Sequence, residues 1–463
     1  MPSRDVIVPS TILFGDQLLL ALGNWLFWMV ISRIATISDV GGATTVYSLL
    51  LLTTTIAQMG LEYPLLKRTL GAKESIFSSA LVIELAIITA SIPLVIYSLN
   101  LLDVENLQEL TWVATGILVF SSVNFVIRFY LLGAYGAKQV LIIDIVGIFV
   151  KFAVGYAMVA SGYGMNGILV AFLFQFLSMT LISIPIIRLK LGGTTYRISH
   201  IMDILKDAVL NTPAKFSRTL IFSLSVVLLA SIGMSETDIG IFYIIMMISI
   251  VAGGLVSGIS YMILPSLPSS VDLSLDSLRV GLSLTVPLIV GLVTAPEMVL
   301  SLIGEHYTIG SMALVILALG IVPSSVVMVG ISRCNTIGNN KGLVIIGLVQ
   351  IILFLIFFMI FVPVYGILGA ALSMTLSFVG TSIQSMRVLG AASIRYAIIS
   401  ALAIGAGWSI SFISNHVIGF ESVISAVISI IVSILIIFML KNISPGEMYS
   451  ILTLPFKKDE IID

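Results

Sequence analysis

The chain alternates between apolar runs of about 20 residues or more and short polar connections. A helix needs roughly 20 apolar residues to cross a bilayer, whereas strands of a membrane barrel would show alternating polarity in segments of about 10 residues. The runs therefore predict membrane-spanning helices. We identify fourteen candidate spans, at about 10–32, 43–66, 75–99, 109–131, 139–160, 165–187, 212–232, 239–264, 277–303, 309–332, 342–363, 367–388, 391–414 and 421–440.

Composition supports a membrane protein. Of the 463 residues, 59% are hydrophobic and only 10% are charged, whereas soluble domains carry about 25% charged residues. We therefore predict an all-α polytopic membrane protein with membrane lipids around it and no nucleic-acid partner. The three histidines and the single cysteine, Cys334, have no ligand spacing among them, so we expect neither a metal site nor a cofactor.

Charge in the connections predicts the orientation of the chain. One set of loops carries most of the Lys and Arg residues, including Lys67, Lys138 and Lys341, whereas the other set is acidic and has Arg33 as almost its only cation. Positively charged loops stay in the cytoplasm. Because the span number is even, both termini are predicted to be cytoplasmic, in a multi-pass protein of the plasma membrane.

The second half of the chain repeats features of the first half. Tyr163, Gly164 and Gly167 recur 202 residues later as Tyr365, Gly366 and Gly369, and Tyr47 in span two is echoed by Tyr243 in span eight. Spans one to six therefore match spans seven to twelve as a parallel repeat, and transporters of this kind often hold substrate between their halves.

The repeat predicts two pseudosymmetric six-helix lobes plus two C-terminal helices. We place the domains as follows: an N-terminal lobe at 1–190, a cytoplasmic interlobe linker at 191–211, a C-terminal lobe at 212–390, two further helices at 391–440 and a cytoplasmic tail at 441–463.

The stretch "GYGMNG", Gly162 to Gly167, matches the G-x-G-x-x-G pattern of dinucleotide sites. That site requires a strand before the glycines and a helix after them within a βαβ unit, and here both flanks are membrane spans. The second copy, "VYGILG", also lacks the first glycine. We interpret both copies as a tight turn followed by close helix packing.

Several longer motifs resemble those of a known family. The run "IGEHYTIGSMALVILALG" with the later "FVPVYGILGAALSMTLS" is similar to the second-half signature of polysaccharide flippases, and "AQMGLEYPLLKR" and "GAYGAKQVLI" are similar to first-half motifs. These flippases belong to the MATE-like multidrug, oligosaccharidyl-lipid and polysaccharide exporter superfamily. The resemblance implies two lobes around a central cavity bordered by spans one, two, seven and eight, and export of lipid-linked oligosaccharide.

Ionisable residues inside spans are costly and normally face a cavity or a partner. Lys151 lies near the middle of span five, and Asp144, seven residues earlier, lies on nearly the same face about 10 Å away along the axis. This separation is too large for a direct contact without bending. Two interpretations remain open: buried ion pairs with neighbours in the first lobe, or groups that face the cavity. The second repeat has Ile346 and Leu353 at these positions, so the fold does not require the charges.

Four cations are candidates for binding an anionic lipid headgroup: Lys151, Arg128, Lys215 and Arg218. The candidates for a gate or for ion coupling are Asp16, Arg218, Asp144 and Glu84. Asp16 and Arg218 occupy equivalent positions with opposite charge, so they either pair across the two lobes or Arg218 anchors its helix at the headgroups. Glu84 is either a hydrogen-bonded residue of the lobe or a proton carrier.

Three functions are compatible with these features. The first is a flippase that moves a polyprenyl-linked oligosaccharide from the cytoplasmic to the outer leaflet, without enzymatic activity, alongside glycosyltransferases or a polymerase of the same pathway. The second is a cation-coupled multidrug exporter, for which carboxylates should dominate the cavity. The third is a membrane glycan polymerase or ligase, which the short outside loops disfavour. We favour the first.

Overall fold

The structure is a computed structural model, and it describes residues 4–62, 65, 76–102, 107–135, 137–188, 205, 208–209, 212, 221–261, 274–418, 422–440 and 442. Within these residues every regular element is a helix. The prediction of an all-α polytopic protein is confirmed.

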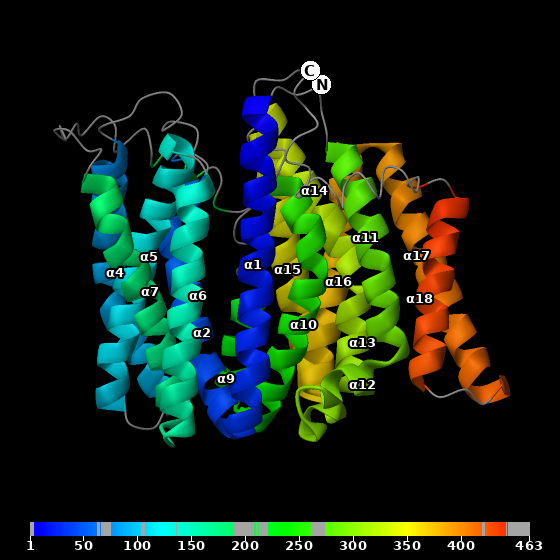
Figure 1. The fold of residues 1–463 in the computed structure, drawn as a ribbon, viewed down its shortest axis with the longest axis horizontal. Coiled ribbons are helices and arrows are strands. Elements are labelled where there is room, and N and C mark those ends of the chain that lie inside the picture. The colour runs from blue at the N-terminus through cyan, green and yellow to red at the C-terminus, as the bar shows by residue number, and fades with distance from the viewer. Residues whose placement is uncertain are drawn as a thin grey trace.

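Successive helices of the first half run in opposite directions through the bundle (Figure 1). They are α1 (Arg4–Ile34), α2 (Ile37–Gln58), α4 (Ile76–Leu101), α5 (Leu107–Tyr135), α6 (Ala137–Ala160) and α7 (Gly164–Arg188).

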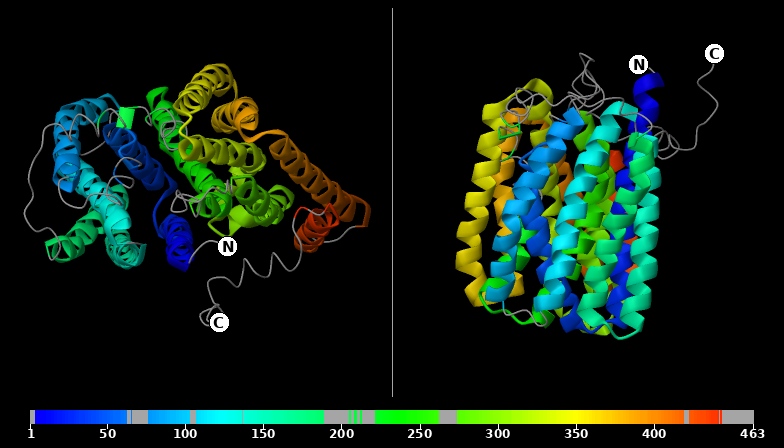
Figure 2. Two further views of the ribbon diagram at one scale, coloured as in Figure 1. Left: turned by 90° about the horizontal axis from the view of Figure 1, so that it is seen from above. Right: turned by 90° about the vertical axis from the view of Figure 1, so that its left-hand side faces the viewer.

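The second half begins at α9 and ends in the two additional helices α17 and α18, which lie at one edge of the molecule (Figures 1 and 2). Its helices are α9 (Ile221–Ser231), α10 (Glu236–Tyr261), α11 (Ser274–Thr294), α12 (Pro296–Ser301), α13 (Ser311–Leu319), α14 (Ile321–Ile337), α15 (Asn340–Tyr365), α16 (Ile367–Leu389), α17 (Ala391–Ile413) and α18 (Ser422–Met439). A 3-10 turn, η3 (Glu305–Gly310), precedes α13, and a π-helical turn, η4 (Ser414–Ile418), follows α17.

The predicted spans coincide with these helices. Among the described residues, twelve helices are long and apolar enough to cross a membrane. Two shorter apolar helices, Leu18–Ile34 and Ile221–Ser231, fall within predicted spans one and seven. Helix α1 begins and α18 ends at the same end of the bundle (Figure 1), as an even number of spans requires. We call this the terminal end, and the opposite end the distal end.

The repeated glycines form matching turns at the distal end, as predicted. Gly164 and Gly366 both have positive φ angles, 46° and 55°, which favour glycine. Three residues later, Gly167 and Gly369 pack against the preceding helix: an added Cβ would lie 3.0 Å from Met158 Cβ and 2.3 Å from the carbonyl oxygen of Phe361, respectively. Glycine therefore lets each half bring two successive helices into close contact.

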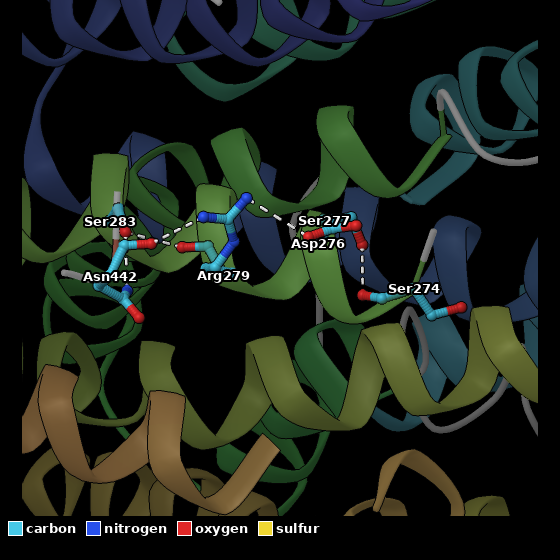
Figure 3. Close-up of polar contacts among 6 residues, drawn as sticks. All are labelled: Ser274, Asp276, Ser277, Arg279, Ser283 and Asn442. Carbon is cyan, nitrogen blue, oxygen red and sulfur yellow. Dashed lines mark hydrogen bonds and ion pairs between the residues drawn. The ribbon is translucent and has the colours of Figure 1, made fainter. Parts of the chain in front are cut away.

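Polar contacts join the end of α18 to α11 at the terminal end, and we call them the polar clasp (Figure 3). Arg279 of α11 donates to the carbonyl oxygen of Asn442 at 3.1 Å, and the Asn442 amide donates to the Ser283 hydroxyl at 2.8 Å. The side chain of Asn442 is 2% exposed, so the clasp holds the end of α18 against α11. The proposed linker, 191–211, and tail, 441–463, lie largely outside the described residues, and the domain boundaries remain predictions.

Candidate functional site

A cavity of about 480 Å³ lies between the two halves of the chain. Helices α1 and α2 contribute to its wall from the first half, and α9 and α10 from the second half. These are the four spans that the resemblance places at the cavity. Helix α7 and helices α13 to α16 complete the wall.

Among the described residues, the side chains that line this cavity are uncharged. One group is aromatic and consists of Trp28, Tyr47, Phe172, Phe222, Tyr243 and Phe378. A second group carries hydroxyl or amide groups and consists of Asn24, Ser48, Ser223, Ser249, Ser324, Ser325, Gln350 and Thr375. Such a wall offers neutral hydrogen-bonding groups and ring faces to a ligand, and no formal charge.

The aromatic groups come from helices of both halves. Tyr47 of α2 stacks on Phe172 of α7 with ring centroids 3.9 Å apart, and Trp28 of α1 meets Tyr243 of α10 edge to face at 5.0 Å. Aromatic pairs at these separations stabilise packing beyond the area that they bury. Tyr47 and Tyr243 are the residues that matched in the repeat, and both line the cavity.

Three of the predicted charged residues form one buried cluster inside the first half. The guanidinium of Arg128 in α5 donates to a carboxylate oxygen of Asp16 in α1 and to a carboxylate oxygen of Asp144 in α6. Asp16 is fully buried, and Asp144 is 2% exposed. Asp16 Oδ1 has no hydrogen-bond partner in the described structure. The cluster thus joins three helices and leaves one carboxylate oxygen unsatisfied.

Lys151 lies apart from this cluster, whereas Asp144 has the ion pair with a first-lobe neighbour that the first of the two interpretations expects. The ammonium group of Lys151 donates to Asn24 Oδ1 and lies 4.7 Å from the ring centroid of Phe27 and 5.1 Å from that of Phe172. Lys151 is fully buried, and both rings are within cation–π distance of its ammonium group. Because Asn24 and Phe172 line the cavity, Lys151 lies directly behind two residues of the cavity wall.

The other predicted site residues do not join the cavity wall in the described structure. Glu84 of α4 is fully buried and is not among the lining residues. Lys215 and Arg218 lie outside the described residues, so the Asp16–Arg218 gate remains a prediction. The role of Lys151 as a headgroup contact is likewise a prediction.

The wall residues that the sequence analysis did not select are neutral. Gln350 is the only side chain with a hydrogen-bonding group between Lys341 and Tyr365 of α15. This isolation in an apolar span is a signal that could have identified it. Asn24 is less distinctive, because its importance depends on its contact with Lys151 from another helix.

The two halves are joined at the distal end by direct contacts between α2 and α10. The Ser38 hydroxyl donates to the carboxylate of Glu236. A Cβ added at Gly41 would lie 1.8 Å from the carbonyl oxygen of Glu236, and one added at Gly240 would lie 2.7 Å from the carbonyl oxygen of Ile37. Backbone meets backbone here, so no other residue fits without separating the helices. The two halves are therefore in tight contact at the distal end.

Asp39 makes further contacts at this end, within the first half. It forms a capping box with Thr36 at the start of α2, and its Oδ1 accepts a hydrogen bond from the backbone N–H of Met165 at 3.0 Å. The side chain of Arg33 in α1 also donates to the carbonyl oxygen of Leu302 in the second half. These contacts hold four segments together at one end of the cavity.

Comparison with solved structures places this arrangement among known membrane transporters. The lipid II flippase MurJ in an inward closed conformation matches with a TM-score of 0.68 and 15% identity, over 96% of this chain and 99% of that chain. The MATE multidrug transporter DinF-BH matches with a TM-score of 0.60 and 18% identity, over 83% and 94%. A MATE transporter in a bent conformation matches with a TM-score of 0.54 and 15% identity, over 88% and 97%.

These similarities establish the fold. The chain shares the all-α polytopic fold of the MATE and MurJ transporters, as the motif resemblance predicted. No protein-family model and no curated protein sequence matches the chain.

Proposed function

We propose that the chain is a flippase that moves a polyprenyl-linked oligosaccharide from the cytoplasmic to the outer leaflet by alternating access of its two lobes. The observation that carries the proposal is the cavity between the two halves, whose described lining is uncharged and rich in hydroxyl groups and aromatic rings, together with the tight contact of the two halves at the distal end. Sugars present hydroxyl groups and apolar ring faces, which such a wall can bind. The likeness to the lipid II flippase MurJ over nearly the whole chain supports this choice.

The proposal includes the predicted orientation in the plasma membrane. With both termini in the cytoplasm, the distal end, where the two halves are in tight contact, faces outward. Glycosyltransferases that build the oligosaccharide, or a polymerase that extends it, are the partners expected in such a pathway. The protein itself moves the substrate without changing its covalent structure.

Reconstitution tests the function directly. Proteoliposomes that contain the purified chain should translocate a fluorescent polyprenyl pyrophosphate-linked oligosaccharide between leaflets, which an impermeant quencher detects. Liposomes with a Gly41→Ala variant, whose distal closure is blocked, should lose most of this translocation. Equal quenching kinetics in protein-free liposomes would contradict the proposal.

A cation-coupled multidrug exporter is the second candidate, and one observation favours it. Within the described residues, the Asp16–Arg128–Asp144 cluster holds two carboxylates against one cation, and Asp16 Oδ1 has no hydrogen-bond partner there. The net negative charge of such a cluster attracts a cation. Uptake of a cationic dye by the same proteoliposomes under an ion gradient, without translocation of the lipid-linked sugar, would select this function.

Lys151→Leu is expected to lower translocation by roughly tenfold while folded protein is still obtained, since a hydrogen bond to a charged group contributes about 1.5–3 kcal/mol. The reason is that Asn24 loses the ammonium group that orients its amide at the cavity wall. Lys151→Arg should retain part of the activity. Folded yield and translocation are measured on the same preparations.

The matched control for Lys151→Leu is Lys341→Leu, which removes an exposed lysine at the start of α15. This variant should translocate at the wild-type rate. Full activity of a stable Lys151→Leu protein would show that translocation requires neither a contact between Lys151 and the headgroup nor the hydrogen bond from Lys151 to Asn24.

A further inference from the structure

Two buried polar side chains in the cavity wall have no hydrogen-bond partner in the part of the chain that the structure describes. Gln350 of α15 is 0% exposed, and neither its Nε2 nor its Oε1 atom makes a hydrogen bond to a described residue. Ser48 of α2 is 1% exposed, and its Oγ atom also makes no hydrogen bond to a described residue. Both line the central cavity, one from each half of the chain.

Such groups need an explanation, because buried polar atoms in proteins nearly always have partners. Neighbouring wall residues do not need a ligand in this way: the hydroxyl groups of Ser249 and Ser325 donate to carbonyl oxygens of their own helices, at 3.2 Å and 2.7 Å. Thr375 donates to the carbonyl oxygen of Ile316 at 2.9 Å. Gln350 and Ser48 therefore differ from most of the polar wall in having their full bonding capacity available.

We infer that Gln350 and Ser48 form a subsite that binds the hydroxyl groups of a neutral sugar in the central cavity, an inference that rests on the flippase function proposed above. A primary amide has two donor hydrogens and an acceptor oxygen, and a serine hydroxyl both donates and accepts. A sugar hydroxyl also donates and accepts, so the three groups match without any charge.

The surrounding wall favours a neutral sugar over an anionic group. The described lining carries no charged side chain. Lys151, a cation that lies behind this wall, is hydrogen-bonded to Asn24 and packed against two rings. Trp28 and Tyr47, which also line the cavity, offer apolar ring surface to the C–H face of a sugar. We therefore place the saccharide in this part of the cavity and its pyrophosphate elsewhere.

Binding measurements on the purified full-length protein test the subsite. The two probes are a short-chain prenyl pyrophosphate that carries a neutral disaccharide and the same prenyl pyrophosphate without sugar. Affinities are measured by titration calorimetry. Gln350→Met, which keeps the length of the side chain, and Ser48→Ala should each weaken binding of the sugar probe by about fivefold, as expected for one neutral hydrogen bond. Neither variant should change the affinity for the sugar-free probe.

Ser425→Ala is the matched control for Ser48→Ala. Ser425 of α18 is also fully buried, with an unbonded Oγ atom, but it does not line the central cavity. This variant should leave both affinities unchanged. The melting temperatures of Gln350→Met and Ser48→Ala should not fall, because each substitution removes an unsatisfied polar group from a buried position.

The outcomes separate the subsite from the function on which it rests. Wild-type protein that prefers the sugar probe, with variants that bind it equally well, overturns the subsite and leaves the flippase proposal standing. Wild-type protein that binds both probes equally shows that the sugar is not recognised and also overturns the subsite. Wild-type protein that binds neither probe overturns both proposals.

Discussion

Arg128→Leu is expected to lower the free energy of unfolding by about 3–5 kcal/mol, the typical effect of breaking a buried ion pair by removing one partner. The Arg128 side chain is the shared cation of Asp16 and Asp144, which come from two other helices. Its removal leaves two buried carboxylates facing each other without a countercharge. SDS-induced unfolding in mixed micelles measures the change.

Two further variants separate charge from packing in this prediction. Arg128→Leu combined with Asp16→Asn and Asp144→Asn should recover much of the lost stability, because replacing every charge of a buried cluster is often neutral. Arg387→Leu removes an exposed arginine at the end of α16 and should change stability by less than about 0.5 kcal/mol. An Arg128→Leu protein as stable as wild type would mean that the carboxylates take up protons in the folded state.

The spans were predictable because the bilayer leaves few options for the chain. Backbone groups inside it must be satisfied within each segment, so length and apolar character identify a helix without reference to its neighbours. The turn at Gly366 was predictable for a similar reason, since the repeat places the same glycines after a span in both halves. Local patterns and the repeat therefore accounted for the membrane spans and these turns, but not for the short elements α12, η3 and η4.

The pairing of charges could not be predicted by the same rules. Asp144 and Lys151 share a helix face, yet Asp144 bonds to Arg128 of α5 and Lys151 bonds to Asn24 of α1. Those partners depend on how three helices pack around one another, which the periodicity of a single helix does not show. The same reason explains why neutral residues of the described cavity wall, such as Gln350, were not selected as binding residues.

Tyr47 shows what the sequence can contribute to a site. Its match with Tyr243 across the repeat placed both residues at equivalent positions, and pseudosymmetry directs equivalent positions of two lobes toward a shared axis. Both side chains do line the cavity. Gln350 has Ile148 at the equivalent position in the first half, so the repeat could not reveal it.

Gly41→Ala is expected to prevent closure of the distal end and to abolish most translocation. The added Cβ would lie 1.8 Å from the carbonyl oxygen of Glu236, and this neighbour is backbone that cannot rotate away. Overpacking in tight contacts costs about 1–3 kcal/mol or more, and every 1.4 kcal/mol changes a population about tenfold. The closed arrangement should therefore lose roughly ten- to hundredfold in population to one in which α2 and α10 are apart.

Disulfide cross-linking reads out this closure independently of transport. Ser38 and Glu236 are hydrogen-bonded across the two halves, so Ser38→Cys with Glu236→Cys, in a Cys334→Ser background, should cross-link readily under mild oxidation. Adding Gly41→Ala should reduce the cross-linked fraction strongly. Gly405→Ala, at a site where an added Cβ meets nothing within 4 Å, is the control and should leave it unchanged. Undiminished cross-linking in the Gly41→Ala protein would show that α2 and α10 can come into contact without this glycine. Loss of translocation in that variant could then not be attributed to a failure of the distal contact to form.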